Sequence, residues 1–281
     1  MGKLHDRMKG DLLLKAYSPH TQSAYLRCAR HFASHYMRSP EEMGEQEIRG
    51  FLLHLVRDRK ASPATLSMYV NALKFLYNIT LKRPEAVKEI PHPKRPKTLP
   101  VILSPQEVLR IFAVIRSVKH KAIIATAYGA GLRISEVCGL RIADIDSQRR
   151  RIHIRSGKGK KDRYVMLGES LLTLLRQYYQ AVRPRGGYLF PGQKPQRHIT
   201  PTAVREVLRK VIRETGLSKR VTMHTLRHCF ATHLLEAGTD IRILQVLLGH
   251  SSIRTTLRYT HITDRLIQKL VSPLDLIQPT S

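Results

Sequence analysis

Apolar residues recur at helical spacing through the first third of the chain. They form three sets, which are Tyr25, Phe32 and Tyr36; Ile48, Leu52 and Leu55; and Leu66, Tyr69, Leu73 and Leu76. A Ser-Pro pair precedes each set, at residues 18–19, 39–40 and 62–63. Serine caps the first turn of a helix through its side chain, and proline fits the first helical position. The pattern therefore predicts a compact helical bundle from residue 12 to about residue 90.

A proline-rich segment follows this bundle. Residues 90–100, IPHPKRPKTLP, contain four prolines and three Lys or Arg residues. Proline removes a backbone donor and blocks helix continuation, so this segment is the expected linker between two domains. We expect an N-terminal domain over residues 1–90, a basic linker over residues 91–100 and a second domain over residues 101–281.

The second domain begins with another helix start, Ser104-Pro105 with Glu107 at the capping-box position. Helices are predicted over residues 105–118, 120–130, 133–140, 169–181, 201–214, 224–237, 240–248 and 252–261. Gly238 and Gly249 are expected to end two of them.

Between the helices the periodicity changes. Ile152 and Ile154 alternate with basic residues, and the apolar residues of RYVML follow a glycine-rich turn, which predicts a β-hairpin. The expected fold class is thus mainly α-helical with a small β-hairpin or sheet.

The net charge of the chain restricts the classes of function that fit it. The chain has 281 residues with 49 Lys and Arg against 21 Asp and Glu, a formal net charge of +28. Such an excess in a folded protein indicates nucleic acid first, although a ribosome-associated or a peripheral membrane protein also fits. No apolar run approaches the roughly 18 residues of a membrane span, and no secretory signal is present, so we expect a cytoplasmic, nucleoid-associated protein. The three cysteines are far apart, which argues against a disulfide framework or a zinc site.

Candidate chemistry is concentrated near the C-terminus. His224 and Arg227 are three residues apart at a predicted helix start, where free N–H groups favour an anion. His250 follows Gly249, and Tyr259 comes nine residues later. Each of these residues alone more often serves packing or solvation. Together they suggest a phosphate site with a nucleophile.

Five motifs in order resemble those of the tyrosine recombinase (phage integrase) family. They are GAGLRISEVCGL, SGKGKKDRYV, HTLRHCFATHLLEAG, LLGHSS and TTLRYTH, and they lie within residues 129–261. The resemblance implies a SAM-like core-binding domain at the N-terminus and an α+β catalytic domain with an exchange segment, residues 262–281, at its end. It also implies double-stranded DNA as partner and a homotetramer on two DNA sites, with no cofactor and no metal.

The resemblance also assigns the catalytic residues, which are Arg133, Lys158, His224, Arg227, His250 and Tyr259. The tyrosine oxygen would attack a DNA phosphate, leaving a 3′-phosphotyrosyl link and a free 5′-hydroxyl, without ATP. Two arginines would clamp the phosphate oxygens. Lys158 would be the general acid, with Lys160 and Lys161 as alternatives, and His224 the favoured base. Glu136 would orient Arg133, unless the two form only an ordinary helical ion pair.

Two other functions remain open at this point. A type IB topoisomerase shares the chemistry, and an accessory DNA-binding protein of a mobile element would bind without cutting. The apolar tail at residues 262–281 favours a recombinase, because such a tail docks on a neighbouring protomer in that family. The alternative is that this tail forms a helix that folds onto the core of its own chain. Xer-type or transposon-borne recombinases are the most similar subtypes. The target sequence and the biological role, whether integration, excision, dimer resolution or transposition, do not follow from the sequence.

Overall fold

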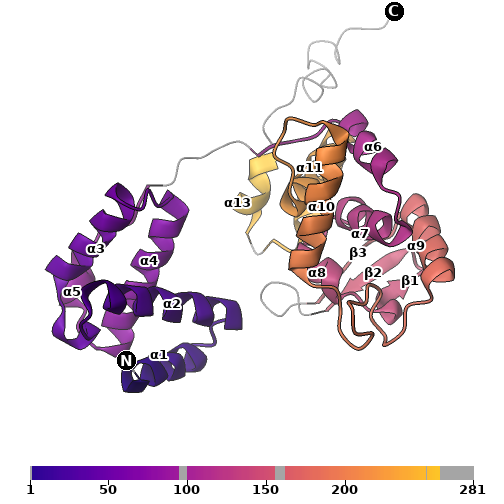
Figure 1. Ribbon diagram of the computed structural model, residues 1–281. Coiled ribbons are helices and arrows are strands. Elements are labelled where there is room, and N and C mark those ends of the chain that lie inside the picture. The colour runs from indigo at the N-terminus through magenta and orange to yellow at the C-terminus, as the bar shows by residue number, and fades with distance from the viewer. Residues whose placement is uncertain (1, 95–99, 156–161, 251, 260–281) are drawn as a thin grey trace, which may run out of the picture. The chain divides into compact units, whose positions relative to one another are not determined.

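The apolar sets along the chain form separate cores in two compact units, Met1–Thr98 and Leu99–Ser281 (Figure 1). The computed structural model describes residues 2–94, 100–155, 162–250 and 252–259. Both units are mostly helical, and the second contains a small antiparallel sheet, which confirms the expected fold class.

The first unit is a bundle of helices. Its elements are α1 (Gly2–Leu14), α2 (Pro19–Tyr36), the 3-10 turn η1 (Pro40–Glu42), α3 (Glu45–Arg57), α4 (Pro63–Phe75), the π-helical turn η2 (Leu76–Thr80) and α5 (Glu85–Lys88). The Ser18 and Ser62 hydroxyls accept from the backbone N–H groups of Thr21 and Thr65, and Ser39 caps η1 in a similar way. The three predicted Ser-Pro starts are therefore confirmed.

Helix α1 was not predicted. Its inward face consists of Leu4, Met8 and Leu12, which are four residues apart and buried. Most of the other residues of the helix are polar, and its remaining leucines, Leu13 and Leu14, are exposed, so the helical period of its apolar residues is weak. Tertiary contacts hold it instead, because it packs on α2 and η2, and Asp11 accepts a hydrogen bond from the Thr80 hydroxyl.

The second unit packs one face of its small sheet against a core that its helices share (Figure 1). Its elements are α6 (Pro105–Val114), α7 (Val118–Gly129), α8 (Ile134–Gly139), the 3-10 turn η3 (Ile142–Asp144), β1 (Ile145–Asp146), β2 (Arg151–Ile154), β3 (Arg163–Met166), α9 (Glu169–Val182), α10 (Pro201–Thr215), α11 (Met223–Glu236), α12 (Ile241–Leu248), α13 (Ile253–Thr256) and the 3-10 turn η4 (Leu257–Tyr259). The Ser104–Glu107 capping box is present at the start of α6.

The predicted hairpin is the centre of a three-stranded antiparallel sheet in the order β1-β2-β3. Ile152 pairs with Val165 and Ile154 with Arg163, and the two isoleucines are buried while their neighbours are partly exposed or exposed. Alternation of this kind places one face of the sheet against the core. Strand β1 was not predicted, because two residues are too few to show a period.

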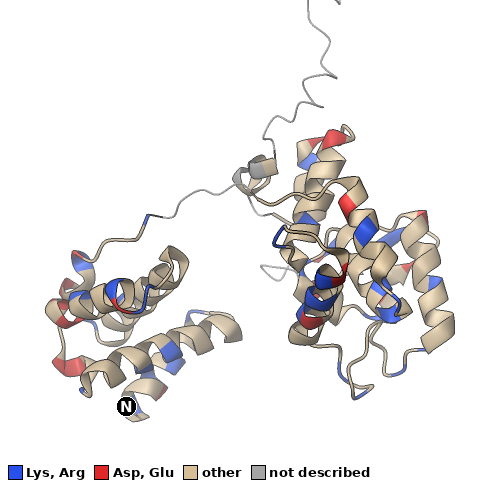
Figure 2. Ribbon diagram, turned by 45° about the horizontal axis from the view of Figure 1, so that its top comes forward, with Lys and Arg blue, Asp and Glu red and all other residues tan. Residues whose placement is uncertain are grey.

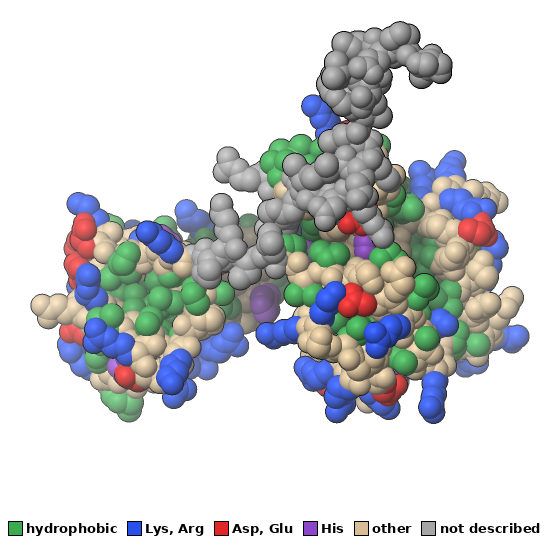
Figure 3. Space-filling model, turned by 90° about the horizontal axis from the view of Figure 1, so that it is seen from above, with side chains coloured by type: hydrophobic (Ala, Val, Ile, Leu, Met, Phe, Trp, Pro, Cys, Tyr) green, Lys and Arg blue, Asp and Glu red, His purple; other side chains and the backbone are tan. Residues whose placement is uncertain are grey.

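Helix α11 runs through the core of the second unit. All residues from Thr225 to Thr232 are buried, including the charged Arg227. This helix is therefore packed on all sides, and the close packing holds its buried polar side chains in position. Elsewhere Lys and Arg residues are spread over the elements of both units (Figure 2), and their side chains are scattered over the face that Figure 3 shows.

The last predicted helix is shorter than expected. A helix was predicted over residues 252–261, but α13 ends at Thr256 and the backbone tightens to a 3-10 turn through Tyr259. Thr255 and Thr256 are β-branched and lose side-chain freedom in a helix, which weakens a short helix of this kind. The predicted exchange segment, residues 262–281, lies outside the described residues.

Candidate active site

Arg227 is the most deeply buried cation of the site. Its side chain is 1% exposed. One terminal nitrogen donates to the Gly131 carbonyl at 2.6 Å and the other to the Leu248 carbonyl at 2.5 Å, and the second nitrogen also lies 3.4 Å from Nε2 of His250. The guanidinium therefore joins the loop before α8, the end of α12 and the candidate histidine.

Glu136 is the shared acceptor of the surrounding arginines. Arg133 donates to it from the backbone and from the side chain, both at 2.8 Å, and Arg163 donates through both terminal nitrogens at 2.8 and 2.9 Å. Arg227 approaches the same carboxylate to 3.8 Å. Burial raises the pKa of Glu136, but the hydrogen bonds from Arg163 and Arg133 outweigh it and lower that pKa to about 2. The carboxylate is therefore ionised at neutral pH.

The charges of this cluster do not balance. Three guanidinium groups, those of Arg133, Arg163 and Arg227, face the single carboxylate of Glu136. Burial, together with repulsion from Arg133, lowers the pKa of Arg227 to about 10, so it remains charged at neutral pH. A part-buried cluster with excess positive charge attracts an anion of phosphate type.

The end of α12 sets the position of His250. Gly249 ends the helix in the left-handed conformation, with φ of +58°, as the sequence predicts. The backbone N–H of His250 donates to the Gln245 carbonyl, and its Nδ1 lies 3.0 Å from the Thr256 hydroxyl. Arg163 donates from Nε to the Leu247 carbonyl at 3.0 Å, so β3 also supports this turn.

Tyr259 is buried beside two histidines. Its side chain packs with Phe230, Leu244 and Leu248, and the residue is only 4% exposed. The Tyr259 hydroxyl lies 2.9 Å from Nδ1 of His228. The His250 ring lies nearly parallel to the Tyr259 ring, with 6.4 Å between centroids.

His224 lies one turn before His228 at the start of α11. It is exposed, and its ring meets that of His228 edge to face at 4.2 Å. The structure thus brings together residues from α8 and its N-cap, from α11, from the end of α12 and from η4, which are Arg133, Glu136, His224, Arg227, His250 and Tyr259. Lys158 and its alternatives, Lys160 and Lys161, lie outside the described residues.

Sequence reasoning missed two members of the cluster, His228 and Arg163. His228 follows Arg227 directly, but its partner Tyr259 is 31 residues away and no local pattern links the two. Arg163 contacts Glu136 and Leu247, which are 27 and 84 residues away, and no local pattern indicates such contacts. Tyr164 on β3 is not part of the cluster: it is 49% exposed, and its ring stacks on His153 and lies under Arg151.

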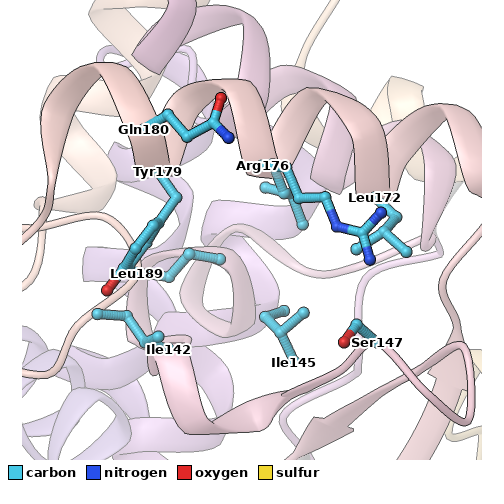
Figure 4. A pocket seen from close by; sticks show the side chains of 9 residues that line it. Ile142, Ile145, Ser147, Leu172, Arg176, Tyr179, Gln180 and Leu189 are labelled. Carbon is cyan, nitrogen blue, oxygen red and sulfur yellow. The ribbon is translucent and has the colours of Figure 1, made fainter.

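Other features of the described residues do not add a second reaction centre. A mainly apolar groove of about 420 Å³ lies between α9 and the η3–β1 segment, and Figure 4 shows Arg176 and Tyr179 on its α9 side. None of its lining residues belongs to the cluster around Arg227. Among the described residues there is no group of three His, Cys, Asp or Glu side chains placed to hold a metal ion. Nor does that part of the chain contain a helix long and apolar enough to cross a membrane.

Comparison with known proteins gives consistent matches along the chain. Residues 102–265 match the model of the phage integrase family, and residues 4–86 match the N-terminal SAM-like domain of phage integrases. An integrase/recombinase of Sinorhizobium fredii is 42% identical over 99% of this chain and 90% of its own length. The tyrosine recombinase XerA of Pyrococcus horikoshii is 36% identical over 85% of this chain and 84% of its own. The structure of the XerH site-specific recombinase bound to its difH substrate, a post-cleavage complex, is 25% identical with a TM-score of 0.69, covering 89% of this chain and 77% of that one.

Proposed function

Because the chain belongs to the phage integrase family and is a tyrosine-type site-specific DNA recombinase, we propose that Tyr259 is the nucleophile that cuts and rejoins DNA. The observation that supports this most directly is the hydroxyl of Tyr259 in a cluster of histidines beside the buried Arg227. The tyrosine oxygen attacks phosphorus and the 5′-oxygen leaves. The resulting 3′-phosphotyrosyl ester is resealed by another 5′-hydroxyl, so the reaction needs no ATP.

Arg133, Arg227 and His250 are proposed to hold the phosphate. Negative charge grows on the nonbridging oxygens in the transition state, and the excess positive charge around Glu136 is already in place to receive it. Fixed donors of this kind contribute about 3–4 kcal/mol each to transition-state stabilisation. Glu136 holds Arg133 and Arg163 in position without neutralising the cluster.

Lys158 is proposed to protonate the leaving 5′-oxygen. It belongs to the segment that joins β2 to β3, and Arg163 at the start of β3 contacts Glu136. Strand β3 is therefore anchored at the proposed phosphate site, and this supports a role for the segment before it in proton transfer there. We propose that His224, which is exposed at the start of α11, contacts the DNA backbone.

Double-stranded DNA is the proposed partner, as in the XerH complex with its difH substrate. We assign core-site binding to the N-terminal domain, residues 1–90, and cleavage to residues 101–281, with residues 91–100 as the linker. Exchange between two duplexes requires four strand cuts, so four protomers on two sites are the proposed assembly. The proposed place of action is the nucleoid in the cytoplasm.

A nicked suicide substrate tests the nucleophile. The duplex carries the sequence that this protein selects from a random DNA library, and covalent protein–DNA adducts are separated on a denaturing gel without added metal. Wild type and Tyr164→Phe, a control at an exposed tyrosine on β3, should form the adduct, whereas Tyr259→Phe should not. An adduct of undiminished yield in Tyr259→Phe would refute the assignment.

A further inference from the structure

We propose that His228 is the base that accepts the phenolic proton of Tyr259 when the tyrosine attacks DNA. The proposal rests on Tyr259 being the nucleophile, as proposed above. It replaces His224, the base that the sequence favoured, with a histidine whose nitrogen lies at the reacting oxygen. His228 is thus assigned as a catalytic residue that acts on the nucleophile and not on the phosphate.

The geometry at the hydroxyl carries this inference. Nδ1 of His228 lies 2.9 Å from the Tyr259 oxygen, within the 2.6–3.2 Å that a general base requires. Tyr259 is 4% exposed and His228 is 9% exposed, so bulk water has little access to the phenolic proton. A tyrosine hydroxyl has a pKa near 10 in water and needs a base at neutral pH. A buried acceptor on a rigid helix meets that need.

The neighbouring histidines have other contacts. Nδ1 of His250 lies 3.0 Å from the Thr256 hydroxyl, and its Nε2 lies 3.4 Å from the Arg227 guanidinium. Both nitrogens of His250 are thereby directed to groups other than the Tyr259 oxygen, which suits a phosphate-binding role. His224 is exposed and contacts the ring of His228, so it lies on the solvent side of the pair.

The proton and electron balance defines the required state of His228. The ring starts neutral, with its proton on Nε2 and a lone pair on Nδ1. As the O–P bond forms, the O–H bond breaks, its electron pair stays on the tyrosine oxygen, and the proton moves to Nδ1. The 5′-oxygen leaves with the electrons of the broken P–O bond and takes a proton from the separate acid, Lys158. When a 5′-hydroxyl attacks the phosphotyrosyl ester, its proton goes to the now neutral Lys158, the bond between phosphorus and the tyrosine oxygen breaks, and His228 returns its proton to that oxygen.

Single-turnover cleavage of the selected, nicked duplex tests the proposal. His228→Ala removes the acceptor, and His228→Asn retains a hydrogen-bonding atom near the position of Nδ1 but no basicity. We expect both to form the covalent adduct about 10²–10⁴-fold more slowly, the range for loss of a general base, while duplex affinity stays within about threefold of wild type. Added imidazole should restore part of the rate of His228→Ala.

The same helix offers a matched control. Nδ1 of His233 lies 2.9 Å from the hydroxyl of Tyr128, a His–Tyr pair with the same nitrogen–oxygen distance outside the site. His233→Asn should therefore cleave like wild type once its thermal unfolding shows that it is folded. A rate for His228→Asn within about threefold of wild type would overturn the base assignment, since a positioning contact alone would then suffice.

A measurement on the wild-type chain covers the case in which the variants do not fold. The ¹⁵N chemical shifts of labelled histidine should show His228 at neutral pH as the Nε2–H tautomer. An Nδ1–H tautomer would mean that His228 donates to Tyr259, and the proposal would fail. Failure of the proposed function gives a different result, because wild type itself would then form no adduct whatever the state of His228.

Discussion

At the scale of single residues, the two arginines that we propose to bind the phosphate differ in their contacts. Arg227 is 1% exposed and satisfies two backbone carbonyls, whereas the Arg133 side chain is 23% exposed and bonded to Glu136. Lysine cannot reproduce the guanidinium fork. We expect Arg227→Lys to lower the free energy of unfolding by about 2–4 kcal/mol, and Arg133→Lys by about 1 kcal/mol or less.

The two substitutions should affect the rate of DNA cleavage differently from the free energy of unfolding. Both substitutions should slow adduct formation by about 10²–10³-fold, because each removes a preorganised donor at the phosphate. Urea unfolding and the single-turnover assay, run on the same preparations, separate the two effects. Equal stability of the two variants would show that the carbonyl contacts of Arg227 contribute little.

The lowered pKa of Glu136 predicts how the free energy of unfolding changes at acid pH. Its pKa in the folded protein is lowered from 4.5 to about 2, so its ionised form favours the folded state. The contribution, about 3 kcal/mol, is complete above the unfolded pKa and is lost as the pH falls from about 4.5 towards 2. Glu136→Gln should therefore be less stable than wild type at pH 7, and the difference should shrink across that window in urea unfolding.

A surface glutamate provides the comparison for this effect. Glu206 pairs with Arg209 in the open, where both side chains are more than half exposed. Glu206→Gln should change stability by less than about 1 kcal/mol at either pH. If Glu136→Gln behaved in the same way, the buried ion cluster would not be contributing to stability.

At the scale of elements, the sequence predicted the helix starts and ends that depend only on residues close together in the chain. Residues within one helical turn determine the Ser-Pro helix starts, the Ser104–Glu107 capping box and the helix end at Gly249. All of these occur where the sequence predicts them. Helix α1 depends on contacts with distant elements, and its sequence is largely polar. The pairing of His228 with Tyr259 likewise requires α11 to meet η4, 31 residues further on. Helical spacing alone could not reveal it.

Arg163 ties three elements together, and this leads to a prediction. It belongs to β3, contacts Glu136 of α8 through both terminal nitrogens and donates to the Leu247 carbonyl of α12. Lysine would keep the charge but could not make all three hydrogen bonds. Arg163→Lys should lower the free energy of unfolding by about 2–4 kcal/mol. It should also slow cleavage, since both Arg133 and the hairpin lose an anchor.

The matched control for Arg163 is another arginine that pairs with a glutamate. Arg209 on α10 is 63% exposed, and Arg209→Lys should alter stability by no more than about 0.5 kcal/mol. Urea unfolding measures both variants. An Arg163→Lys protein as stable as Arg209→Lys would contradict the anchoring role.

At the scale of the whole molecule, the charge exceeds what the active site uses. The net charge of +28 is spread over helices of both units (Figure 2). A folded chain that carries this excess repels itself, and a polyanion relieves that repulsion. The cluster around Glu136 accounts for only a few of the 49 basic residues. Most of the others are therefore available for phosphates along the duplex, where they add affinity without reading sequence.

Salt dependence tests this last point. Each phosphate neutralised by Lys or Arg releases counterions, so the logarithm of the affinity falls linearly with the logarithm of salt concentration. With about 6–10 phosphate contacts, affinity for the selected duplex should fall about 10³–10⁵-fold between 50 and 200 mM salt. Fluorescence anisotropy with Tyr259→Phe measures binding without cleavage, and a random-sequence duplex should show a similar slope at lower affinity. A slope near zero would mean that the basic surfaces do not contact the DNA backbone, and another explanation of the charge would be needed.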